Sequence, residues 1–112
     1  MKDCLFCKIA SGEIPSKKVF EDDRIYAFYD IAPAAPTHVL VIPKEHIDGA
    51  DCINAANSET VAYIFAAIPR IAESLGLKNG YRIVSNVGAD AGQTVRHLHF
   101  HILGGAELGR MC

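Results

Sequence analysis

Three of the five histidines in this chain stand at alternate positions, as His97, His99 and His101. Alternate residues of a β-strand project from the same face, about 7 Å apart. The residues between them are leucine and phenylalanine, and isoleucine follows the third histidine. Such a run predicts a strand at 97–103 with imidazoles on one face and a hydrophobic core on the other.

The histidine run leaves more than one use open. A buried strand gains nothing from three imidazoles, because each must find a hydrogen-bonding partner when it is removed from water. Histidines at this spacing also form metal sites. Three solvated imidazoles on an exposed edge would need no function, and we consider this reading the least favoured.

Four further segments of apolar and β-branched residues indicate strands. They lie at residues 19–21, 24–29, 38–42 and 81–85. Their order and short connections, interrupted by one helical stretch, predict an antiparallel α+β arrangement. We therefore expect a single domain over residues 1–112, built on a five-stranded antiparallel sheet with one long and one short helix.

Two segments have the signals of helices. Apolar residues recur at helical spacing after Ser58, which suits the N-cap, and Gly76 suits the stop. A shorter helix is expected at 3–12, with Asp3 as its N-cap and Gly12 just past its end.

Composition excludes several classes of protein. The formal net charge is −2 without a cluster of Lys and Arg, which argues against nucleic acid as a partner. Apolar stretches are too short to span a bilayer, and no secretory leader opens the chain, so we expect a cytoplasmic protein without a membrane partner. Cys52 and Cys112 are expected to be ordinary thiols.

The segment at 92–105, GQTVRHLHFHILGG, closely resembles the signature of the histidine-triad (HIT) family. Its lead-in and its closing Gly-Gly are similar to the Hint branch, the purine nucleoside phosphoramidases. Further similarity covers nearly the whole chain in the same order, at residues 20–23, 27–28, 30–31, 35–38, 40–44, 46–47 and 80–82.

The resemblance implies roles for four polar residues. His99 would attack the α-phosphorus of a nucleotide and form a transient nucleotidyl-histidine. His101 and His38 would donate to phosphate oxygens or complete a hydrogen-bond relay. Thr94 takes the place of a family serine near the leaving group.

The resemblance also implies a nucleotide site. Asp30 matches the carboxylate that binds both ribose hydroxyls, although it would equally suit an Asp-x-x-Pro turn. The other matching positions are Phe6, Ile9, Phe28 and Ile31 around the purine, and Asn86, Gly92, Gln93, Thr94, Val95, His99 and His101 around the phosphate. The four apolar residues would serve equally well as core packing.

Cys4 and Cys7 form a C-x-x-C pair, which without a signal peptide indicates metal ligation or redox chemistry. With His46 and His97 they resemble a Cys₂His₂ zinc site of some bacterial histidine-triad proteins. Four protein ligands leave no open position, so the zinc would be structural and catalysis would need no cofactor. Two reduced thiols near the surface are the alternative.

We expect an enzyme that hydrolyses adenosine or guanosine 5′-phosphoramidates and releases AMP or GMP. The alternatives are a Fhit-like dinucleoside polyphosphate hydrolase, a non-enzymatic nucleotide-binding module and a cupin-like metal site. A complete set of His38, His97, His99 and His101 favours the enzyme, because binding alone needs no nucleophile.

The resemblance implies a homodimer in which two five-stranded sheets run on as one ten-stranded sheet. The helical stripe of Ile64, Ile68 and Ile71 is a candidate interface, or it is buried within the monomer. The tail after Leu103 lacks the Trp-Pro ending that is frequent in the branch, which predicts an open leaving-group side.

Overall fold

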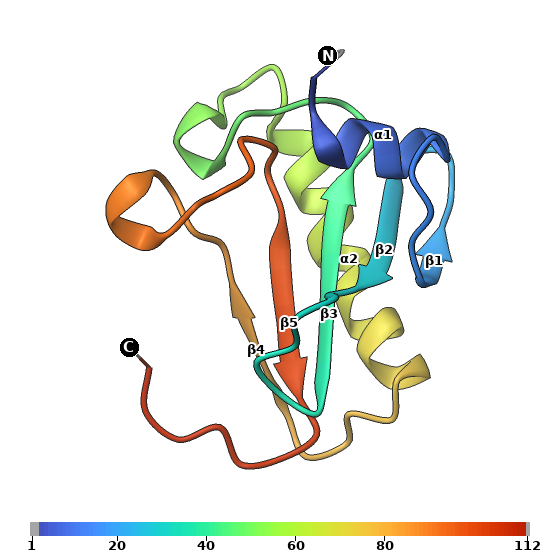
Figure 1. The fold of residues 1–112 in the computed structure, drawn as a ribbon, viewed down its shortest axis with the longest axis vertical. Coiled ribbons are helices and arrows are strands. Elements are labelled where there is room, and N and C mark those ends of the chain that lie inside the picture. The colour runs from blue at the N-terminus through green and yellow to red at the C-terminus, as the bar shows by residue number, and fades with distance from the viewer. Residues whose placement is uncertain (1–2, 112) are drawn as a thin grey trace.

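Five antiparallel strands form one sheet in the order β1-β2-β3-β5-β4 (Figure 1). The computed structural model describes residues 3–111, so Cys112 lies outside the described part. The strands are β1 (Lys18–Glu21), β2 (Ile25–Tyr29), β3 (Thr37–Pro43), β4 (Tyr81–Val84) and β5 (Phe100–Gly104). The expected α+β fold class, with its five-stranded antiparallel sheet, is confirmed.

The long helix α2 (Ser58–Ser74) covers one face of the sheet. Its buried residues Ile64, Ile68 and Ile71 belong to the same core cluster as Val39 and Ile102 of the two central strands. The isoleucine stripe is therefore part of the monomer core, and its alternative use as an exposed dimer face is wrong. Neither helix in residues 3–111 has the length and apolar character to cross a membrane.

The short helix α1 (Leu5–Ser11) lies on the opposite face. Phe6 and Ile9 form a second core cluster there with Phe28, Leu40 and Ile42. The two clusters alternate along β3, because successive side chains of a strand point to opposite faces. The face that carries α1 is therefore also the face of His38, which precedes Leu40 by two residues.

The helix starts differ from the expected caps. The N-cap of α1 is Cys4 instead of Asp3, and the Cys4 sulfur accepts a hydrogen bond from the backbone N–H of Cys7 at 3.4 Å. Ser58 is already helical, because its N–H donates to the carbonyl of Asn54 at 2.9 Å, and Asn57 is the N-cap. Both expected caps were one residue out of place.

The strand that was expected from residue 97 begins at Phe100. The register pairs Phe100 with Val41, so an extended ladder would place Leu98 opposite Pro43. Proline has no N–H to donate, and the ladder ends there. The N–H of Leu98 donates instead to the carbonyl of Ile47 at 2.6 Å.

Candidate active site

Three imidazoles lie in a row on the face of the sheet opposite α2. His38 stands on β3 and His101 on the neighbouring β5, with ring centroids 5.1 Å apart. His99, which precedes β5, has its ring centroid 5.1 Å from that of His101. The edge of Phe6, from α1, closes the row at 5.0 Å from His99. The row therefore spans two central strands and ends under α1.

Hydrogen bonds fix the tautomers at one end of this row. The backbone N–H of Ala34 donates to Nδ1 of His38 at 3.0 Å. Neutral His38 therefore carries its proton on Nε2, which lies 2.8 Å from Nδ1 of His101 and donates to it. The proton of His101 is then on Nε2, a buried atom without a partner among the described residues.

The protonation state of His101 agrees with this arrangement. Burial, together with smaller contributions from the neighbouring His99 and His38, lowers the pKa of His101 to about 4. His101 is therefore neutral near pH 7, and it acts as a hydrogen-bond donor without carrying a charge.

The tautomer of His99 is fixed by the main chain. Its Nδ1 lies 2.6 Å from the carbonyl oxygen of His97, which can only accept. Nδ1 therefore holds the proton, and in the neutral ring Nε2 has the lone pair. The Oγ of Ser85 donates to the carbonyl of His99 at 2.9 Å and restrains the peptide that follows His99. A neutral imidazole oriented in this way can act as a nucleophile.

Asp30 lies beside the histidine row. Its Oδ1 accepts from the N–H of Ala32 at 2.8 Å, and its Oδ2 is 3.5 Å from Nε2 of His38. A hollow of about 470 Å³ opens here; its lining residues are Lys17, Tyr29, Asp30, Ile31, Pro33, Pro36 and His38. Both roles considered for Asp30 are therefore compatible with its geometry, because its Oδ1 makes the turn and the residue also lines the hollow.

The structure does not bring the four expected purine-binding residues into one open pocket. Ile31 is fully exposed at the hollow. Phe6, Ile9 and Phe28 are buried in the second core cluster, between α1 and the sheet. Lys17 and Tyr29 also line the hollow. They could not be singled out from the sequence, because neither lies in a motif that indicates a binding role.

The loop that precedes the histidines is held by the Gln93 side chain. Its Nε2 donates to the carbonyls of Asp48 and Val95, at 3.0 and 3.1 Å, and its Oε1 accepts from the N–H of Gly88 at 2.9 Å. Thr94 is exposed beside this loop. Gly92 has a φ of 78°, which favours glycine, and Asn86 is half-buried just after β4. Gln93 thus shapes the loop from within.

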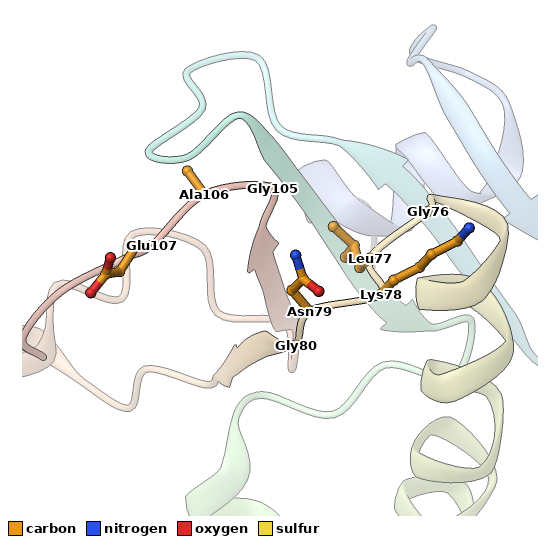
Figure 2. Close-up of a pocket in the computed structure, with 8 residues that line it drawn as sticks. All are labelled: Gly76, Leu77, Lys78, Asn79, Gly80, Gly105, Ala106 and Glu107. Carbon is orange, nitrogen blue, oxygen red and sulfur yellow. The ribbon is translucent and has the colours of Figure 1, made fainter.

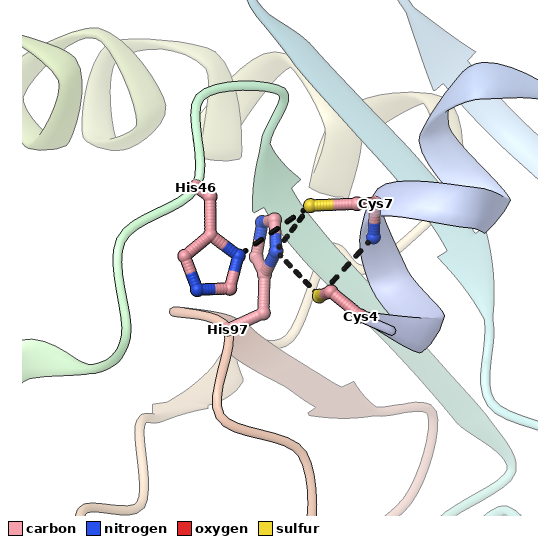
Figure 3. A group of neighbouring side chains, drawn as sticks. All are labelled: Cys4, Cys7, His46 and His97. Atoms are coloured by element: carbon pink, nitrogen blue, oxygen red, sulfur yellow. Dashed lines mark hydrogen bonds between the residues drawn. The ribbon is translucent and has the colours of Figure 1, made fainter. Parts of the chain in front are cut away.

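Cys4, Cys7, His46 and His97 converge between α1 and the two loops on the same side of the molecule (Figure 3). The potential ligand atoms all lie within 4.8 Å of one another. Nδ1 of His97 is 3.3 Å from the Cys4 sulfur and 3.5 Å from the Cys7 sulfur, and Nδ1 of His46 is 3.4 Å from the Cys7 sulfur. A tetrahedral zinc ion separates sulfur and nitrogen ligands by about 3.5 Å, so these spacings fit one.

Outer hydrogen bonds orient both imidazoles of this cluster. Nε2 of His97 donates to the carbonyl of Pro43 at 2.8 Å, and Nε2 of His46 donates to Oδ1 of Asp48 at 2.7 Å. Both Nδ1 lone pairs therefore face the sulfurs, as ligation requires. Burial lowers the pKa of His97 to about 4, so its ring is neutral, and burial raises the pKa of the Cys7 thiol. The His46-x-Asp48 spacing could have indicated this carboxylate partner.

A different hollow, of about 570 Å³, lies at the other end of the sheet from α1 (Figure 2). Its lining residues are Gly76, Leu77, Lys78, Asn79, Gly80, Gly105, Ala106 and Glu107. None of the expected site residues is among them, and two exposed side chains of opposite charge are its only ionisable groups. The candidate active site is therefore the histidine row on the α1 face.

Known proteins are similar to this chain in sequence and in fold. The HIT domain model matches residues 11–108. The solved structure of a HIT family hydrolase from Clostridium thermocellum has a TM-score of 0.95 and 48% identity, covering 99% of this chain and 97% of that one. A histidine triad protein from Clostridium difficile has the same values. A HIT-like protein of Rickettsia prowazekii is 46% identical over 109 residues, 96% of this chain and 91% of its own length. The chain belongs to the HIT domain family.

Proposed function

We propose that this protein hydrolyses purine nucleoside phosphoramidates at the α-phosphorus through a covalent adduct on His99. The observation that carries the proposal is the hydrogen bond from Nδ1 of His99 to the carbonyl of His97, which leaves the Nε2 lone pair free to attack. The similarity to a HIT family hydrolase from Clostridium thermocellum supports hydrolysis as the type of reaction.

The proposed reaction has two steps. Nε2 of His99 forms a bond to the α-phosphorus while the phosphorus–nitrogen bond breaks, and the leaving nitrogen takes a proton from solvent to depart as the amine. Water then attacks the same phosphorus, gives a proton back to solvent and displaces His99, which releases AMP or GMP. Nε2–H of His101 donates to a phosphate oxygen as negative charge builds on it. Thr94 supplies a hydroxyl on the leaving-group side.

We place the nucleoside at the hollow beside Asp30. The Oδ2 atom of Asp30 is available to accept from ribose hydroxyls, because only Oδ1 is engaged by the turn. Ile31 is a fully exposed large apolar residue, and such a side chain at a hollow is suited to contact a base. Phe6, Ile9 and Phe28 form the packed floor of this half of the molecule.

We further propose that Cys4, Cys7, His46 and His97 hold a structural zinc ion. Their spacings and outer hydrogen bonds fit one, and the cytosol keeps thiols reduced and available as ligands. The ion would link α1 to two loops and leave no position for substrate. We therefore assign it no part in bond making or breaking.

We propose a homodimer in which β4 pairs with β4 of a second copy to give a ten-stranded sheet. β4 is an edge strand, and an edge invites pairing when it is not protected. Ile83 on β4 and Phe65 on α2 are 36% and 43% exposed, which is high for large apolar side chains in a small domain. A symmetric pairing would cover such surface.

The test of the proposed activity compares adenosine 5′-phosphoramidate with a diadenosine polyphosphate, using wild type, His99→Ala and the control Cys52→Ser. We expect faster turnover of the phosphoramidate and a nucleotidyl group on the peptide that contains His99, detected by mass spectrometry of quenched reactions. His99→Ala should bind AMP but form no adduct, and Cys52→Ser should match wild type.

Two results would contradict the proposal. Preferential hydrolysis of the diadenosine compound would identify a Fhit-like enzyme. Tight AMP binding without turnover of either compound would identify a nucleotide-binding module.

A further inference from the structure

We propose that the Cys4–Cys7–His46–His97 cluster, when it holds its metal, positions the His99 nucleophile. Loss of the metal should therefore slow formation of the nucleotidyl-histidine and leave nucleotide affinity unchanged. This inference rests on the proposed function of His99, and it gives the cluster a role beyond stabilising the fold.

The first connection runs through His97, which takes part in both sites. Its ring is held at both nitrogens, with Nδ1 facing the sulfurs of Cys4 and Cys7 and Nε2–H on the carbonyl of Pro43. Its own carbonyl accepts the 2.6 Å hydrogen bond from Nδ1 of His99. The peptide that bears this carbonyl is also held by the N–H of Leu98, which donates to the carbonyl of Ile47, the residue that follows His46. The acceptor for His99 is therefore joined to two residues of the cluster.

The second connection runs through Phe6, which lies between the two cysteines in the sequence. Its ring packs edge-on against both His97 and His99, with centroids 6.1 and 5.0 Å apart. The first turn of α1 therefore carries two ligands and also one wall of the nucleophile. A shift of this turn would move both contacts of His99 together.

The cluster is weakly held by its own side chains. The two imidazoles present Nδ1 to the two sulfurs, and S–H groups are weak hydrogen-bond donors. Without an ion, only these weak contacts and the packing of Phe6 join His97 to α1, and the His97 carbonyl is less restrained. The other His99 tautomer, with its proton on Nε2, then becomes populated, and that tautomer has no lone pair for the phosphorus.

The hollow beside Asp30 shares no lining residue with the cluster or with Phe6. Its lining residues lie before β1, at the end of β2, in the β2–β3 connection and at the start of β3. Metal loss should therefore separate two measurements that a general loosening of the fold would change together: the rate of adduct formation and the affinity for AMP.

The test removes one ligand and then restores it. The His46 ring contacts the Cys7 sulfur, the Asp48 carboxylate and the His97 ring, and within residues 3–111 it makes no hydrogen bond to His99 or to the carbonyl of His97. His46→Ala therefore removes a metal ligand without removing a partner of the nucleophile. His46→Cys gives a Cys₃His set, which structural zinc also accepts. For each variant we would measure bound zinc, circular dichroism, AMP affinity and the single-turnover rate of adduct formation, with Cys52→Ser as the control.

We expect folded, zinc-poor His46→Ala to bind AMP within about twofold of wild type and to form the adduct at least about tenfold more slowly. His46→Cys should recover zinc and most of the rate. Adduct formation at the wild-type rate in zinc-poor His46→Ala would overturn the inference. A parallel loss of rate and AMP affinity would also overturn it.

Two further measurements cover the remaining outcomes. The ¹⁵N shifts of His99 at one fixed pH report its tautomer without turnover, so they test the positioning even if wild type forms no adduct and the proposed function fails. If His46→Ala does not fold, Asp48→Ala keeps all four ligands and loosens only His46. Its adduct rate should rise to the wild-type value with added zinc, and a rate independent of zinc would contradict the inference.

Discussion

Nε2 of His38 lies 2.8 Å from Nδ1 of His101, and this contact determines which nitrogen of His101 carries a proton. The backbone N–H of Ala34 sets the direction of both hydrogen bonds, because it can only donate to Nδ1 of His38. The loop before β3 therefore determines that Nε2 of His101 carries the proton. Substitutions can test this relay, because an asparagine amide can replace Nδ1 of a histidine and a glutamine amide can replace Nε2.

We expect His38→Gln to retain more activity than His38→Asn. The glutamine amide nitrogen can take the place of Nε2 and donate to His101, whereas the asparagine oxygen takes the place of Nδ1 and satisfies only Ala34. Loss of the His101 donor should lower kcat by about 10- to 100-fold in His38→Asn. Steady-state kinetics with adenosine 5′-phosphoramidate would measure it, and equal kcat values in the two variants would contradict the relay.

Asp30→Asn should weaken recognition of the ribose while it keeps the turn. The asparagine oxygen can still accept from Ala32, but the amide nitrogen that replaces Oδ2 cannot accept from a hydroxyl. We expect a loss of about 1–3 kcal/mol in kcat/KM. Removing the ribose hydroxyls from the substrate should cost wild type a similar amount and Asp30→Asn nothing more, and additive losses would place the ribose elsewhere.

The free energy of unfolding should decrease as the pH is lowered, because His101 is half-buried and neutral in the folded protein. Its pKa is about 4 in the folded protein and near 6.5 in the unfolded chain, so the unfolded state binds more protons between these values. The contribution is complete above about pH 6.5 and is lost as the pH falls through about 4, by at most about 3 kcal/mol. Urea unfolding should show a flatter pH dependence for His101→Asn than for wild type.

A lysine on the edge of β4 should separate the proposed dimer. Ile83→Lys places a charge where the two sheets would meet, and it should give a folded monomer by light scattering. Ala55→Lys adds the same charge on an exposed loop and should leave the dimer intact. A monomeric wild type at micromolar concentration would contradict the dimer itself.

The parts of the fold that depend on local pattern could be predicted from the sequence. Period-two and period-3.6 apolar patterns located the strands and α2, because burial on one face imposes those periods. The site depended on atoms that have no such pattern. The N–H of Ala34 and the carbonyl of Pro43 belong to the backbone, which is the same in every residue, so only the fold reveals that they orient His38 and His97.

Helix starts failed for a related reason. A side chain caps a helix only if the chain enters at the right angle, and that angle depends on distant packing. At α1 the sulfur of Cys4 takes the position that an aspartate one residue earlier was expected to fill. The same atom faces His97, so a capping group and a potential metal ligand coincide in one residue.

Pro43, which ends β3, gives His97 and His99 different surroundings. In an unbroken strand His97 and His99 would point the same way and draw on the same surroundings. Since Pro43 offers no N–H, the strand begins three residues later than expected, and the free carbonyl of Pro43 accepts a hydrogen bond from the ring of His97. The His97 ring then faces the potential metal ligands, while His99 is the proposed nucleophile. This difference between two nearby histidines follows from the missing N–H of Pro43.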